Sequence, residues 1–79
     1  MIWVFEIVSP GSDLDGEWWE CHELTRRAAE GRADTRLVRV FALASPERKA
    51  VTTIKLVGTK RTWGAEMVPW TEERAATAA

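Results

Sequence analysis

The sequence predicts a small α/β domain of the α+β type, in which a four-stranded, mostly antiparallel sheet carries one helix on one face. Residues 2–8 follow the two-residue repeat of a strand, and residues 12–30 carry apolar side chains at helical spacing. Residues 35–44 and 50–57 are two apolar runs joined by a proline turn. With a further strand at residues 62–68, the expected order is β-α-β-β-β, which closes as a sheet with one covering helix.

The first strand is expected at residues 2–8. Trp3, Phe5 and Ile7 fall on one face, because successive strand side chains point to opposite sides of the sheet. A Ser-Pro-Gly tripeptide at residues 9–11 ends the strand, since proline cannot donate to the ladder and glycine frees the turn.

The helix is expected from about residue 12 to residue 30. Acidic residues crowd its N-terminal half and two arginines lie near its C-terminal end, which suits the helix macrodipole. Leu14, Trp18 and Cys21 recur at spacings of four and three, which is typical of a buried stripe. Gly31 is expected to stop the helix.

The second half of the chain is expected to be all strand and turn. Residues 35–44 form the strongest predicted strand, and the Ser-Pro-Glu-Arg segment at residues 45–48 has the chemistry of a type I turn. Residues 50–57 then complete a hairpin. We expect a single α+β domain over residues 1–70 and a flexible, alanine-rich C-terminal tail over residues 71–79.

The predicted sheet has more apolar surface than one helix covers. Both faces of the strands at residues 2–8 and 35–44 are largely apolar. A strand with one face exposed to solvent should instead alternate apolar with polar residues. The second face is therefore expected to pack on another subunit, as in a homodimer, or to receive a partner.

The amino-acid composition predicts the cellular compartment of the protein and limits the kinds of site that it can form. The chain has 79 residues, one cysteine and one histidine, so an intrachain disulfide is impossible and most metal sites lack ligands. A lone thiol suits a reducing compartment, and the apolar run at residues 2–8 is too short for a signal peptide or a membrane span. We expect a cytoplasmic protein with no metal and no cofactor.

No set of residues predicts catalysis, and we expect the chain not to be an enzyme. Cys21 and His22 are helix neighbours in this prediction and point about 100° apart, so a thiol–imidazole pair does not form. The acidic residues before them are explained by helix capping and a solvated face. Asp13 and Asp15 resemble the middle of a calcium loop, but its first and last ligand positions fall on Gly11 and His22.

Tryptophan is the compositional outlier, with five in 79 residues and no tyrosine. Trp3 and Trp18 are expected in the core, on faces that meet. Trp19 lies off the helix stripe, where it either closes the edge of the core or stands exposed as an anchor for a partner. The predicted partner-binding residues are Trp19, Trp63, Trp70, Arg39 and Phe41.

Nucleic-acid binding is the alternative function. Arg48, Lys49, Lys60 and Arg61 sit in predicted turns, with Lys55 on the strand between them. If the twist of the sheet brings them together with Arg36 and Arg39, they form a basic stripe alongside Trp63, and basic residues beside an aromatic can hold a single strand. The charge balance argues against it, because eleven Lys and Arg face twelve Asp and Glu.

In overall build the chain resembles the small inhibitors encoded by phages and mobile elements, the anti-CRISPR proteins among them. The resemblance covers the whole chain as an architecture of about this length, α/β and without enzymatic motifs. No family motif carries it, so it transfers no binding residue. It implies a stoichiometric inhibitor that blocks a bacterial nucleoprotein defence complex by protein–protein contact. A structural subunit of a larger assembly is a further alternative.

Overall fold

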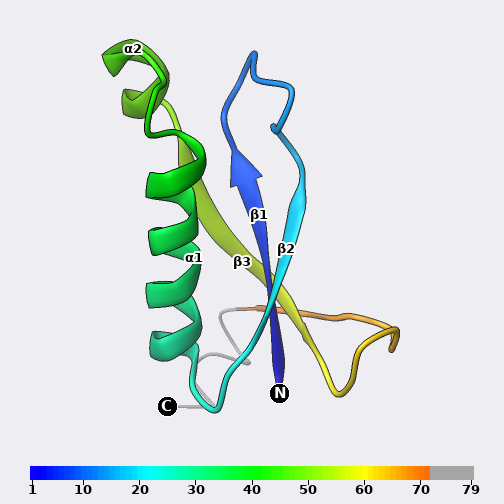
Figure 1. Ribbon diagram of the computed structural model, residues 1–79. Coiled ribbons are helices and arrows are strands. Elements are labelled where there is room, and N and C mark those ends of the chain that lie inside the picture. The colour runs from blue at the N-terminus through cyan, green and yellow to red at the C-terminus, as the bar shows by residue number, and fades with distance from the viewer. Residues whose placement is uncertain (72–79) are drawn as a thin grey trace.

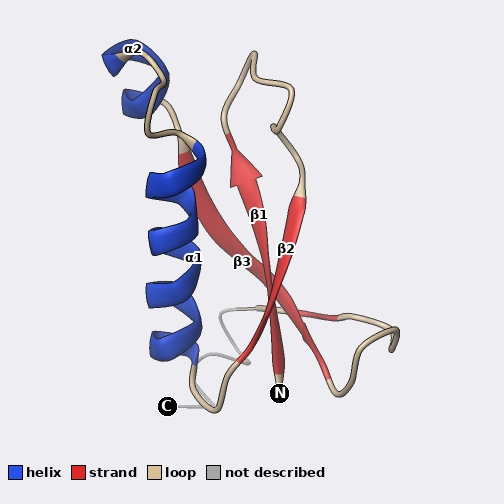
Figure 2. Cartoon of the chain, viewed as in Figure 1, coloured by secondary structure: helices blue, strands red, loops and turns tan. Residues whose placement is uncertain are grey.

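The computed structural model describes residues 1–71 and is shown in Figure 1. In chain order the elements are β1 (Ile2–Val8), β2 (Trp18–His22), α1 (Arg26–Val40), α2 (Pro46–Ala50), β3 (Thr53–Lys60) and β4 (Val68–Pro69). The strands form one sheet in the order β2-β1-β3-β4, and all neighbours are antiparallel. Figure 2 shows α1 lying along one face of this sheet. The predicted fold class, an antiparallel four-stranded sheet with one main helix, is confirmed. The predicted order β-α-β-β-β is wrong, because β2 precedes α1 and the short α2 follows it.

The buried layer between α1 and the sheet confirms the predicted inner face of β1. Its residues are Trp3, Phe5, Ile7, Trp19, Ala29, Ala33 and Phe41. Ala29 and Ala33 are fully buried on α1, and their small side chains let the helix backbone approach the aromatic side chains of β1 closely.

The helix predicted at residues 12–30 is wrong, because a turn and β2 occupy its first part. The turn uses Gly11 and Gly16 at positive φ, 87° and 84°, which glycine tolerates best. The Asp15 carboxylate accepts the Ser9 backbone N–H at 2.8 Å, so it closes the turn instead of capping a helix. β2 then pairs with β1 along its length, and this long-range pairing overrides the local helical spacing.

The strand predicted at residues 35–44 is also wrong, because residues up to Val40 belong to α1. The Thr25 hydroxyl caps this helix by accepting the Ala28 backbone N–H at 3.2 Å. Gly31, expected to stop a helix, lies inside this one. A short apolar run does not by itself distinguish a strand from a helix, and here residues 35–40 end α1 while residues 41–43 form a turn.

The predicted turn at residues 45–48 is the start of α2. The Ser45 hydroxyl accepts the Arg48 backbone N–H at 3.1 Å, and Pro46 occupies the first helical turn. β3 begins three residues later than predicted, and the predicted strand at 62–68 is reduced to Val68–Pro69. Of the predicted tail, residues 72–79 lie outside the described residues.

The second face of the sheet is not the spare apolar surface that the sequence predicted. Lys55 forms an ion pair with Glu6 at 3.3 Å. Lys60 on β3 pairs with Glu20 on β2, so the pair bridges over β1, which lies between those strands. Met67 lies directly over Gly58, the ladder partner of Val4. The premise for a homodimer through this face is therefore wrong, since charged pairs and Met67 cover it.

Candidate functional site

The open edge of β2 is the first component of the candidate site. Within residues 1–71, β2 pairs only with β1. The backbone bonds Ile7 N–H to Glu17 O and Glu23 N–H to Met1 O show that odd-numbered residues of this segment face β1. In an antiparallel ladder the alternate residues turn outward. The N–H and C=O groups of Trp18, Glu20 and His22 therefore point away from the sheet.

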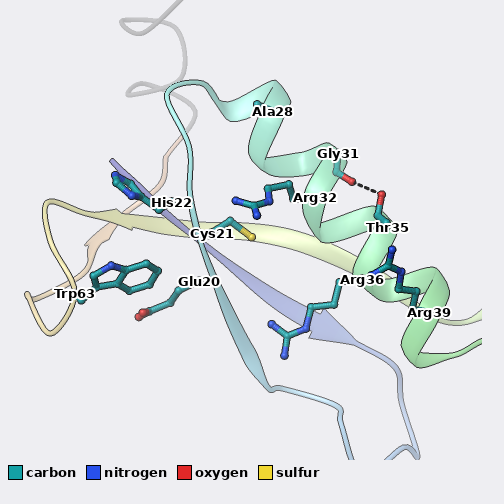
Figure 3. A pocket seen from close by; sticks show the side chains of 10 residues that line it. All are labelled: Glu20, Cys21, His22, Ala28, Gly31, Arg32, Thr35, Arg36, Arg39 and Trp63. Atoms are coloured by element: carbon teal, nitrogen blue, oxygen red, sulfur yellow. Dashed lines mark hydrogen bonds between the residues drawn. The ribbon is translucent and has the colours of Figure 1, made fainter.

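The second component is a row of arginines on α1. Arg32, Arg36 and Arg39 stand at spacings of four and three, so they share one flank of the helix. This flank and the edge of β2 enclose an open groove of about 660 Å³. We call it the arginine groove; its lining residues are Glu20, Cys21, His22, Ala28, Gly31, Arg32, Thr35, Arg36, Arg39 and Trp63 (Figure 3).

Local contacts position two of these three guanidinium groups. Arg32 forms an ion pair with Glu23 at 3.0 Å. The Arg36 guanidinium lies 4.3 Å from the centre of the Trp19 ring, in a cation–π contact. Arg39 has no ion pair within residues 1–71, so its charge is available to a ligand.

Aromatic side chains stand on the other side of β2. The His22 and Trp63 rings meet edge to face with centroids 6.2 Å apart (Figure 3). Trp18 and Trp63 are 49% and 60% exposed, which is unusual for so large an apolar side chain. The edge of β2 is thus flanked by cationic side chains on the helix side and by aromatic ones on the other.

Cys21 and His22 do not form a catalytic pair in this site. As successive strand residues they point to opposite faces of the sheet, so the separation predicted from the sequence holds for a different reason. Burial raises the pKa of the Cys21 thiol, against a smaller opposing effect of Arg32 and Arg36. The thiolate, which is the reactive form, is therefore disfavoured.

The structure brings together two of the five predicted partner-binding residues, Arg39 and Trp63, in the arginine groove. Trp19 and Phe41 are buried in the core. Trp70 lies on the opposite flank of α1, against the Trp3 ring at 5.7 Å and beneath the Arg26 guanidinium. Trp18, expected in the core, is exposed.

The basic residues of the alternative function are dispersed. Arg48 donates to the Pro10 carbonyl at 2.6 Å and to the Ser9 hydroxyl at 3.1 Å, so it ties α2 to the first turn. Lys55 and Lys60 are in ion pairs. The basic stripe expected from the turns does not form, and the arginines of α1 provide the cationic surface instead.

Among residues 1–71, no three side chains of the metal-binding types gather into a possible site. None of the helices described there has the length and apolarity needed to cross a bilayer. No protein-family model, curated protein or solved structure matches the chain.

The sequence reasoning missed Arg32 and Trp18 as site residues, and it named Arg36 only for the basic stripe of the alternative function. The two arginines fell on opposite sides of a predicted loop-to-strand boundary. Their spacing becomes a signal only once residues 26–40 are known to be helical. Trp18 was assigned to the core by a helical period, and its exposure follows from the strand period of β2.

Proposed function

We propose that this protein is a non-enzymatic binding protein that occludes a protein partner through the arginine groove. One observation carries this proposal. Three arginines line the same groove as a strand edge whose outward backbone groups lack a partner within residues 1–71. Such a site holds an extended chain by backbone hydrogen bonds and by charge. It needs no metal, cofactor or activated nucleophile.

The biological role that we propose is stoichiometric inhibition of a bacterial nucleoprotein defence complex, in the manner of an anti-CRISPR protein of a phage or mobile element. The small size, the α+β fold and a groove suited to binding a partner protein support this role. The protein would act in the cytoplasm, where such complexes work and where a single thiol stays reduced.

Phage infection tests the role. A bacterium whose CRISPR system targets a phage should regain plaques of that phage when it expresses this protein. Arg39→Glu should abolish the rescue, because it reverses the charge of a groove arginine that forms no ion pair with any of residues 1–71. Arg27→Glu, at an exposed position of α1 outside the groove, should rescue as the wild type does. Failure to rescue in hosts of every CRISPR type tested would overturn the role.

The second candidate, single-stranded nucleic-acid binding, is favoured by one observation. Trp63 is exposed and stands beside His22 at the mouth of a groove that contains three arginines, which is a stacking platform next to cationic groups. Binding to a labelled oligonucleotide that weakens steeply between low and physiological salt would favour this candidate.

A further inference from the structure

The backbone groups at the edge of β2 restrict the kind of ligand that fits. Trp18, Glu20 and His22 each present one N–H donor and one C=O acceptor outward. A second polypeptide strand satisfies both kinds of group. The phosphates of a nucleic-acid backbone offer only acceptors, so they satisfy the N–H groups of β2 and leave its carbonyls without donors. The edge therefore favours a peptide over a nucleic acid.

The helix side of the groove sets the charge of that peptide. Arg32 and Arg39 are separated by a rise of roughly 10 Å along α1, at about 1.5 Å per residue. Side chains on one face of a strand repeat about every 6.7 Å. Two or three alternate residues of an added strand thus reach the arginine row, and acidic residues there would meet guanidinium groups in charge-assisted hydrogen bonds.

The side of β2 that faces away from α1 determines which residues suit the positions between the acidic residues of the ligand strand. Strand residues that point away from α1 would lie beside Trp18, His22 and Trp63. The exposed indole surfaces there favour apolar side chains. A ligand strand that alternates acidic and apolar residues therefore complements both sides of the edge.

A second copy of this chain fits the same edge less well. Antiparallel pairing of β2 with its own copy would bring the two α1 helices to the same face on either side of the new seam. The arginine rows of the two copies would then face each other, and like charges at close range are unfavourable. Charge complementarity thus selects an acidic partner over a homodimer.

We propose that the arginine groove binds an extended segment of a partner protein with alternating acidic and apolar residues, which adds to the edge of β2 as a further strand. This inference rests on the proposed function and names the chemistry of its partner. The partner strand would place its acidic side chains on Arg32, Arg36 and Arg39.

Fluorescence anisotropy with defined peptides tests this inference on the full chain. The probe is a labelled peptide of about eight residues, slightly longer than β2, that alternates glutamate and valine. We expect it to bind at least about tenfold more tightly than the lysine–valine peptide and than a peptide of the same composition in two blocks. Methylation of the backbone nitrogens that face β2 should weaken binding about tenfold or more, because it removes the donors of the ladder.

The variants locate the site. Arg39→Ala should reduce the affinity for the glutamate–valine peptide by about tenfold or more, and Arg27→Ala should leave it unchanged. Arg36→Ala is a second groove variant. Because Arg36 also packs on Trp19, its affinity for the peptide should be compared with that of the wild type at equal concentrations of folded protein.

Each other outcome overturns the inference in a distinct way. Equal affinity for the methylated peptide would show attraction by charge without strand addition. Tighter binding of an oligothymidine would identify the groove as a nucleic-acid site, and a mass of twice 8.9 kDa by light scattering without peptide would identify a second copy as the occupant. If phage rescue occurs and depends on Arg39 but the peptides fail, the proposed function stands and the partner chemistry is wrong.

Discussion

The indole N–H of Trp18 donates a hydrogen bond to Glu6 Oε1 at 3.1 Å, across the β1–β2 pair and on the face opposite α1. Lys55 approaches the other carboxylate oxygen of Glu6 from β3. Three strands are thereby joined in one row of side chains, Trp18 to Glu6 to Lys55. This row explains how a tryptophan stands at an open edge with its ring exposed and its orientation fixed.

The first prediction concerns the Glu6 carboxyl. The hydrogen bond from Trp18 is the largest cause that holds the pKa of Glu6 below its usual range, with Lys55 adding to it against desolvation. Trp18→Phe removes the donor, so the pKa of Glu6 should rise. Carbon-detected NMR titration of the two proteins measures this shift, and an unchanged pKa would show that the hydrogen bond does not persist in solution.

The same group sets a pH dependence. Because its pKa is lower in the folded than in the unfolded chain, its contribution to stability is present above the unfolded pKa and is lost as the pH falls through the folded pKa. The acid-induced loss of stability in that range should be smaller in Trp18→Phe than in the wild type, as urea unfolding at several pH values would measure.

The second prediction separates adjacent tryptophans. Trp19 is buried against Ile7 and Phe41, so Trp19→Ala should lower the free energy of unfolding by about 3–5 kcal/mol. Trp18 is half exposed and its hydrogen bond to Glu6 lies in solvent, so Trp18→Ala should lower it far less than Trp19→Ala does. Chemical denaturation compares the two variants. Equal losses would contradict the orientation of β2.

The third prediction uses a pair of glycines. A Cβ on Gly58 would lie 2.6 Å from Met67 Cγ and 2.6 Å from the Val68 carbonyl oxygen, so Gly58→Ala should destabilise by about 1–3 kcal/mol. Gly31 lies within α1 and has open space around it, so Gly31→Ala should stabilise by about 0.5–1 kcal/mol. Thermal unfolding of the two variants should show melting temperatures that move in opposite directions; a Gly58→Ala protein as stable as the wild type would mean that residues 67–68 do not cover β3.

The fourth prediction concerns Cys21. Burial raises the pKa of its thiol, so it should react with a disulfide reagent at neutral pH more slowly than the same thiol in the unfolded chain. Cys21→Ala should still rescue phage growth. If the Cys21→Ala protein folded but no longer rescued phage growth, the thiol would have to be counted as a functional group.

The sequence predicted the fold class and the inner face of β1 but misplaced the central elements. Trp18 and Cys21 have a helical spacing, yet they lie in β2, which pairs with β1. Leu37 to Leu43 have the composition of a strand, yet residues up to Val40 belong to α1 and a turn follows. The Thr25 cap and the left-handed glycines at 11 and 16 were readable signals for the true boundaries. Arg39 and Trp63 were predicted at the site, whereas their place on the same groove depends on how the chain passes from β2 through α1 to β3.

Amide hydrogen exchange tests the central claim, that a partner strand adds to the edge of β2. In the free protein the amides of Glu20 and His22 should exchange rapidly, because they point outward, while that of Cys21, which faces β1, is protected. Saturation with the glutamate–valine peptide should slow exchange at Glu20 and His22 by about tenfold or more and leave the exposed Arg27 amide unchanged. Amides of Glu20 and His22 that exchange equally fast with and without bound peptide would contradict the account.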